Sequence, residues 1–255
     1  MTILFLLVVG LGVGLTSSFL GAGGGVLVVP LLPHFMDISL KSVVATAQAT
    51  VLFIVLFNTV SFRRSVKVPL KLTLLLSIGT ATGAFVAARL NVASGDRTVA
   101  LATISLLLFL GFLMFLQATG VIKKGPHVAQ DFPGNDKLIY FTAVSMVAGA
   151  SGGFTGIGAG LIMTSLLTLL PSVNPGHVVP MANACMLFST LASVAAFSTT
   201  PGLVQWSMAL TIFAGATVTA YWGSGRQHLI APHKRQYMLA LVLIIIAFEI
   251  FRRYF

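Results

Sequence analysis

The sequence predicts an all-α polytopic membrane protein built from two homologous repeats. Of its 255 residues, 57% are hydrophobic and only 8% are charged, and the mean hydropathy is +1.01, a combination that soluble domains do not show. Apolar stretches of about 20 residues, the length that spans a bilayer as a helix, recur along the chain. A glycine-rich motif near the start occurs again 135 residues later. Internal duplication in an apolar chain is typical of transporters built from repeats.

Two segments of each half align at this offset without a gap. Residues 19–25 (FLGAGGG) align with residues 154–160 (FTGIGAG), and residues 47–49 (AQA) align with residues 182–184 (ANA). We therefore expect a first transmembrane repeat, an inter-repeat linker and a second transmembrane repeat, at residues 1–120, 121–137 and 138–255.

Each half is expected to begin with a glycine-broken segment, at residues 2–35 and 138–170. Each segment is long enough for two helices or half-helices that meet at the glycines. Backbone opened at that depth must be buried in protein or line a cavity, because lipid cannot satisfy it. Residues 1–15 lack a basic start, so we expect a retained first helix rather than a cleaved signal peptide.

Three spanning helices are expected after each broken segment, and glycine pairs such as Gly10 and Gly14 predict that helices pack closely. The predicted spans are residues 40–62, 70–90 and 98–118 in the first half, and residues 178–198, 207–223 and 237–251 in the second.

The orientation of the two halves depends on the broken segments. If each segment enters the bilayer and returns, each half has an odd number of passes and the halves are inverted, whereas an odd crossing would make them parallel. Ten basic residues then fall on one side and five on the other, so the first side is expected to be cytoplasmic and both termini outside. The ten are Arg63, Arg64, Lys67, Lys71, Lys123, Lys124, Lys137, Arg226, Lys234 and Arg235, and the five are Lys41, Arg89, Arg97, Arg252 and Arg253.

Composition also excludes several classes of function. The net charge of +10 does not indicate a nucleic-acid partner, because the basic residues lie in short loops between apolar runs. The single cysteine, Cys185, excludes an intrachain disulfide and a multi-cysteine metal site, and we expect no metal and no cofactor. No Asp, Lys or Arg falls in the middle of a predicted helix, so neither a carboxylate proton relay nor a fixed cationic trap for an anion is expected.

The repeated glycine motifs are the strongest candidates for a substrate site. Glycine lets backbone N–H groups approach a ligand, and a helix that starts after the glycines points its positive end at an anion. The alternative is that these glycines serve helix packing alone. The predicted substrate-binding residues of the motifs are Gly21, Gly23, Gly24, Gly25, Gly156, Gly158, Ala159 and Gly160.

Two amides occupy equivalent positions downstream of the motifs. Gln48 and Asn183 each lie in an apolar helix, where an amide can donate to an anion oxygen or serve as an interhelical hydrogen bond. Cys185 lies two residues beyond Asn183 and completes the predicted substrate-binding set. Two residues correspond to a turn of about 200° along a helix, so Cys185 as a small buried apolar residue is the alternative.

A catalytic function is the weaker hypothesis. Residues 149–153 (GASGG) resemble the Gly-x-Ser-Gly of rhomboid intramembrane proteases, with Ser151 as the nucleophile. A serine nucleophile needs a base, and no histidine lies in the middle of a helix downstream. We therefore expect no enzyme activity and no catalytic residues. His34 and His177 lie near the ends of the broken segments, with no assigned role.

The glycine motif followed by Val-Pro-Leu-Leu, at residues 21–32, and its second copy at residues 156–160 resemble the TauE/SafE sulfite exporter family of membrane permeases. The resemblance covers nearly the whole chain and implies transport of sulfur-containing or organic anions such as sulfite or sulfonates. The second copy departs from the first, with Ala159 in place of a glycine and Ser165 in place of Pro30. We therefore do not expect the two half-sites to be strictly symmetric.

We expect a secondary transporter, an exporter of such an anion, that works by alternating access around a site at the middle of the bilayer. An anion channel with the same pore is the main alternative. The expected partners are the small anion and the lipid bilayer, and the expected location is a bacterial inner membrane. The sequence does not determine the oligomeric state, the anion or a coupling ion.

Overall fold

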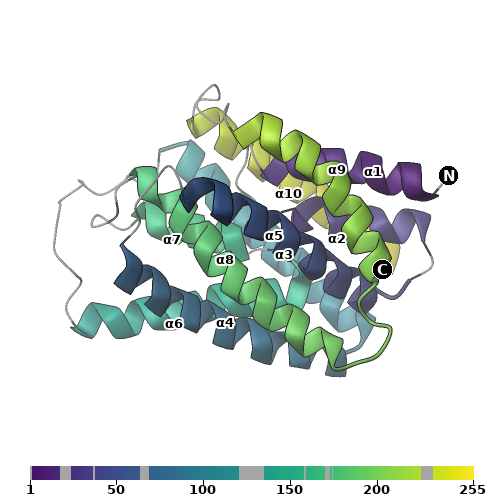
Figure 1. Cartoon of the computed structure of the whole chain (residues 1–255), viewed down its shortest axis with the longest axis horizontal. Coiled ribbons are helices and arrows are strands. Elements are labelled where there is room, and N and C mark those ends of the chain that lie inside the picture. The colour runs from purple at the N-terminus through teal and green to yellow at the C-terminus, as the bar shows by residue number, and fades with distance from the viewer. Residues whose placement is uncertain are drawn as a thin grey trace.

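The computed structural model describes residues 2–17, 24–36, 38–63, 69–120, 135–157, 159–169, 173, 175–224 and 232–255. These residues form ten α-helices and no strand (Figure 1), which confirms the predicted all-α fold. The first half contains α1 (Thr2–Leu15), α2 (Gly25–Phe35), α3 (Leu40–Arg63), α4 (Leu70–Ala93) and α5 (Asp96–Ala118). The second contains α6 (Asn135–Thr155), α7 (Ala159–Leu169), α8 (Pro175–Ser198), α9 (Trp206–Ser224) and α10 (Pro232–Tyr254).

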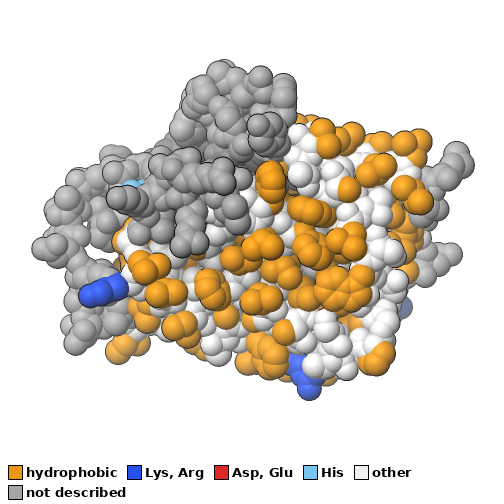
Figure 2. Space-filling model, viewed as in Figure 1, with side chains coloured by type: hydrophobic (Ala, Val, Ile, Leu, Met, Phe, Trp, Pro, Cys, Tyr) orange, Lys and Arg blue, Asp and Glu red, His pale blue; other side chains and the backbone are white. Residues whose placement is uncertain are grey.

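Several helices are suited to a bilayer. Four segments are long and apolar enough to cross one, and α1 and α9 contain shorter apolar stretches. Large hydrophobic side chains such as Ile78, Phe109 and Leu241 are exposed, and Figure 2 shows hydrophobic side chains spread over the described part of one face. The four segments are Leu40–Thr59, Leu70–Ala93, Asp96–Ala118 and His177–Ser198.

The helix bounds repeat at the offset found in the sequence. Adding 135 to the bounds of α3 gives residues 175–198, which are the bounds of α8, and α5 and α10 agree to within one residue. Both halves therefore have the same order of elements, with two helices around the glycine break and three helices after it. α6 begins at Asn135, so the last residues of the predicted linker are helical. That residues 1–120 and 138–255 are two repeats joined by a linker stays a prediction.

The two halves interlock through their first helices. α1 packs along α9, and α6 packs along α4. Close approach depends on glycine, because a Cβ on Gly10 would strike the Ile212 carbonyl and a Cβ on Gly149 would strike the Thr80 carbonyl. The predicted close packing is thus observed. The first helix of each half packs against a helix of the other half.

Corresponding helices run in opposite directions where they pack. Ser42, at the start of α3, donates to the Leu203 carbonyl just after α8 at 2.7 Å. Gln117, at the end of α5, accepts from Gln236 near the start of α10 at 3.1 Å. The N- and C-termini lie at the same end of the molecule (Figure 1).

The same end holds a small polar network. Lys41 donates to the Val92 carbonyl at 3.0 Å, and Asp96 accepts the Leu40 N–H at 3.2 Å. At the end of α10, Arg252 pairs with Glu249 at 2.9 Å, the salt bridge expected from their spacing on a helix. The bonds of Lys41 and Asp96 connect the start of α3 to the junction of α4 and α5, and the salt bridge lies within α10.

Candidate functional site

The two glycine-rich breaks meet inside the helix bundle. α2 begins at Gly25, and a Cβ on this residue would strike the carbonyl oxygen of Gly156 in the other break. Gly156 has a φ of +75°, a left-handed conformation that favours glycine. A Cβ there would also come within 3.1 Å of Val29 and 3.3 Å of Val44. The backbones of the two halves touch here because both residues lack a side chain.

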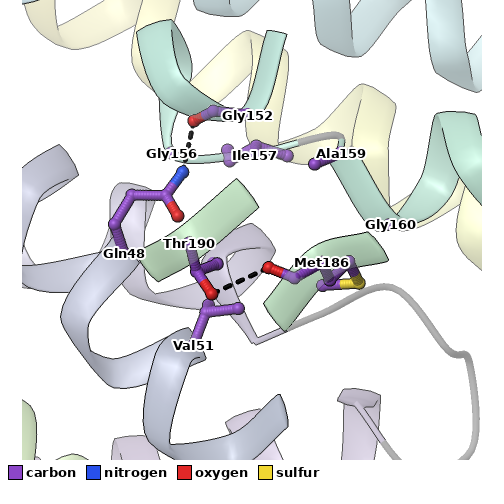
Figure 3. Close-up of a pocket in the computed structure, with 10 residues that line it drawn as sticks. Gln48, Val51, Gly152, Gly156, Ile157, Ala159, Gly160, Met186 and Thr190 are labelled. Carbon is purple, nitrogen blue, oxygen red and sulfur yellow. Dashed lines mark hydrogen bonds between the residues drawn. The ribbon is translucent and has the colours of Figure 1, made fainter. Parts of the chain in front are cut away.

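A small cavity, open on one side, lies at this junction, and the empty space within it and at its open side is about 260 Å³ (Figure 3). The walls come from both breaks and from the two long helices α3 and α8. None of the described residues that line it is charged. They are Gly25, Gln48, Val51, Gly152, Gly156, Ile157, Ala159, Gly160, Met186 and Thr190.

Two helix N-termini open onto the cavity. α2 starts at Gly25 and α7 starts at Ala159, and both residues line the space. The first turn of each helix has no acidic residue, and Gly24 makes no side-chain capping bond to α2. First-turn N–H groups have no partner within their own helix, and the helix dipole makes this end positive. The described walls therefore present two helix N-termini, the C-terminal end of α6 at Gly152 and Gly156, and no charged side chain.

These two helices are also short. Each has 11 residues, about 16 Å at 1.5 Å per residue, whereas the hydrocarbon core of a bilayer is roughly 30 Å thick. Neither helix crosses the core alone.

Gln48 is a polar side chain that contacts the end of α6, just before the break of the second half. It is buried, with 3% of its surface exposed, and its Nε2 donates to the Gly152 carbonyl near the end of α6. Its Oε1 is buried and has no hydrogen-bond partner among the described residues. Figure 3 shows the amide between Gly152 and the side of the cavity that holds Thr190.

Five of the predicted substrate-binding residues line the cavity, namely Gly25, Gln48, Gly156, Ala159 and Gly160. Gly24 lies beside it, where a Cβ would strike Val13 and come within 3.2 Å of Ile54. Gly21, Gly23 and Gly158 fall outside the described residues. That the five bind a substrate stays a prediction.

Two predicted residues face other partners. The Asn183 amide donates to the Val179 carbonyl of its own helix at 2.9 Å. Cys185 is buried against α4, with Ser77 Oγ at 3.7 Å from its sulfur and Thr80 Oγ1 at 3.1 Å from its carbonyl oxygen. Neither Asn183 nor Cys185 lines the cavity, so α8 presents other side chains to it.

Sequence reasoning missed Val51, Gly152, Ile157, Met186 and Thr190. Two of these carried a usable signal, because Val51 and Met186 align at the repeat offset and each lies three residues after an amide. Residues three apart share a helix face. Thr190 gave no such signal, since its counterpart is Val55.

Other polar groups near the break are engaged locally. Ser151, the nucleophile of the protease hypothesis, donates to the Ala148 carbonyl at 2.8 Å. Thr190 donates to the Met186 carbonyl at 2.8 Å. Within the described part of the chain, no group of three or more His, Cys, Asp and Glu residues could hold a metal ion. The side chain of His34 lies outside the described residues.

Comparison with known proteins identifies the kind of molecule. Residues 6–250 match the family model described as sulfite exporter TauE/SafE. The chain is 23% identical to a Bacillus subtilis protein named "Probable membrane transporter protein YunE", over 98% of this chain and 97% of that protein. It is 27% identical to a Methanocaldococcus jannaschii protein named "Probable membrane transporter protein MJ0441", over 93% and 91%. No solved structure matches the chain significantly.

Proposed function

The chain belongs to the TauE/SafE sulfite exporter family and is a multi-pass membrane transporter, and from this premise we propose its cargo and mechanism. The cargo is a small sulfur-containing or organic anion such as sulfite or an organosulfonate. The protein is a secondary transporter that exports this anion by alternating access around the cavity between the two glycine breaks.

The meeting of two helix N-termini at one uncharged cavity is the observation that carries this proposal. Gly25 and Gly160 are repeat-matched, and both lie in the first turns of the helices that open onto the space. Backbone N–H groups and dipoles at such ends bind anions. Without a lysine or arginine in the described walls, binding is weak enough for the anion to leave again.

The arrangement of the halves supports alternating access. α3 and α8 run in opposite directions, as do α5 and α10, and the cavity lies where both breaks meet. We propose that the halves are inverted repeats across the membrane, with the more basic end in the cytoplasm. Rocking of inverted repeats around a fixed site is the general scheme for such carriers.

The membrane potential is sufficient to drive export of a monoanion. One negative charge that leaves across 100 mV gains about 2.3 kcal/mol. None of the described residues that line the cavity is acidic. We therefore assign no carboxylate of the protein to proton coupling.

Counterflow in proteoliposomes tests the proposal. Purified protein is reconstituted in vesicles loaded with unlabelled sulfite, and entry of labelled sulfite is followed with sulfate, acetate, chloride, taurine and sulfoacetate as competitors. We expect saturable counterflow that sulfur-containing anions inhibit. A potential-driven anion current without counterflow would show a channel instead, and no flux of any of these anions would overturn the assigned cargo.

Gly160→Ala connects the flux to the cavity. A Cβ at Gly160 would strike Met186 Sδ, the movable end of a flexible side chain, so the new methyl occupies cavity space at little strain. We expect counterflow to fall at least about tenfold. Gly95→Ala is the matched control, because a Cβ at Gly95 meets nothing within 4 Å. Equal loss in both variants would show that the effect does not come from the cavity.

A further inference from the structure

Gln48 has a buried acceptor that the proposed anion site does not use. Its Nε2 donates to the Gly152 carbonyl, and because a carbonyl only accepts, this bond fixes which end of the amide is nitrogen. Its Oε1 is buried without a partner among the described residues. A buried polar atom left unpaired is costly, and in a native protein it calls for a partner.

No described side chain in the cavity supplies a proton to this oxygen. The Thr190 hydroxyl group donates its hydrogen bond to the Met186 carbonyl at 2.8 Å or to the Leu187 carbonyl at 3.1 Å. Val51, Ile157 and Met186 present apolar groups. A ligand that carries its own donor would pair with this oxygen.

We propose that the cavity binds an oxyanion that carries its own hydrogen-bond donor, and that Gln48 Oε1 accepts from that donor. This inference rests on the proposed function and names the substrate class of the same site. The negative oxygens face the N-termini of α2 and α7, and the donor faces Gln48. A singly protonated anion such as hydrogensulfite has this chemistry, and so does an aminosulfonate, whose ammonium group is the donor.

Anions without a donor fit less well. A fully deprotonated oxyanion, or a simple alkylsulfonate, places oxygen lone pairs or a methyl group against Gln48 Oε1 and leaves it unpaired. A site built to pair with a substrate N–H or O–H rejects analogues that lack it far more strongly than a site that distinguishes only size. Selection by Gln48 therefore separates anions of the same charge and similar volume.

Two ligand pairs test the inference by calorimetry on the purified protein in detergent, at one mildly acidic pH. The first pair is hydrogensulfite and methanesulfonate, monoanions of similar size with and without an acidic proton. The second is taurine and ethanesulfonate, which share a sulfonate and differ by the ammonium group, so that taurine is a zwitterion and ethanesulfonate a monoanion. We expect the donor-bearing member of at least one pair to bind at least about tenfold tighter, the factor that corresponds to one well-made hydrogen bond of about 1.4 kcal/mol.

The pair that shows the preference identifies the source of the donor. Equal affinities within both pairs would overturn the inference and leave the anion site intact. Binding by none of the four ligands would overturn the proposed function as well, so the two failures are distinct. The comparison is made on the unaltered protein, so its outcome does not depend on whether a variant folds.

Two variants assign the preference to Gln48. In Gln48→Leu we expect the two members of the preferred pair to bind within about twofold of each other, since the acceptor is gone. Asn91→Leu is the control, because Asn91 is also a fully buried amide that donates to the end of α6, at the Phe154 carbonyl, but does not line the cavity. Preference kept in Gln48→Leu, or lost equally in Asn91→Leu, would overturn the role of Gln48.

Discussion

The first and second halves of the chain bring the same backbone feature to the cavity but different side chains. In both halves a short helix starts at the cavity wall, with Gly25 and Gly160 as matched positions. Downstream, Gln48 reaches across to the Gly152 carbonyl, whereas Asn183 bonds to Val179 in its own helix. The two halves thus give the cavity a similar backbone on both sides, and side chains of different length make it asymmetric.

The difference between the two amides follows from one methylene group. The shorter side chain of asparagine suits the carbonyl four residues back on its own helix, a common local bond for short polar side chains. The longer glutamine chain places its amide beyond its own helix surface. Gln48 therefore both connects α3 to the break of the second half and leaves an acceptor at the cavity.

The largest effect is expected when the two matched glycines are compared. In Gly25→Ala the new Cβ strikes a backbone carbonyl oxygen, so the helices must separate, whereas in Gly160→Ala it strikes the movable Met186 side chain. Overpacking of this kind typically destabilises by about 1–3 kcal/mol. We expect thermal unfolding in detergent to show a loss of stability of about this size for Gly25→Ala. For Gly160→Ala we expect less than half of that loss. Equal losses would mean that the two halves tolerate bulk at the junction alike.

The amides give the next largest effect. Gln48→Leu is expected to weaken anion binding by about tenfold, because it removes the buried hydrogen-bonding group at the cavity. Asn183→Leu is expected to weaken binding by less than about threefold, because this amide bonds within its own helix. Calorimetric titration with the anion identified by counterflow measures both. If Asn183→Leu weakens binding as much as Gln48→Leu, then Asn183 faces the anion in another state of the transport cycle.

The sequence predicted the long helices and the two glycine breaks well. Apolar length placed the long helices, and the predicted start of α4 at residue 70 and end of α8 at residue 198 agree with the structure. The glycine motifs predicted both breaks, because a left-handed residue such as Gly156 and a carbonyl contact such as that of Gly25 leave glycine as the residue that fits. These features depend on local backbone and on the properties of lipid.

The side-chain orientations that the sequence did not predict depend on contacts with residues far away in the chain. Whether Asn183 turns to the cavity or to its own helix is decided by side-chain reach and by the helices packed around α8. Cys185 lies against Ser77 and Thr80 of α4, more than 100 positions away in the chain. Helix periodicity placed Cys185 on a different face from Asn183, but it could not say which face meets the cavity. Combining the repeat offset with helical spacing would have found Val51 and Met186.

The smallest effect is expected at Thr190, where the halves differ by one hydroxyl group. Its counterpart Val55 has nearly the same shape, and Thr190→Val makes the two halves alike at this position. The Thr190 proton is bound by a carbonyl of its own helix at 2.8 Å, so its removal frees no group that a ligand needs. We expect anion affinity to change by less than about twofold and stability to fall by about 1 kcal/mol or less. A tenfold loss of affinity in calorimetry would show instead that the hydroxyl turns from Met186 to the anion on binding, and the second half would then contribute a side-chain donor that balances Gln48.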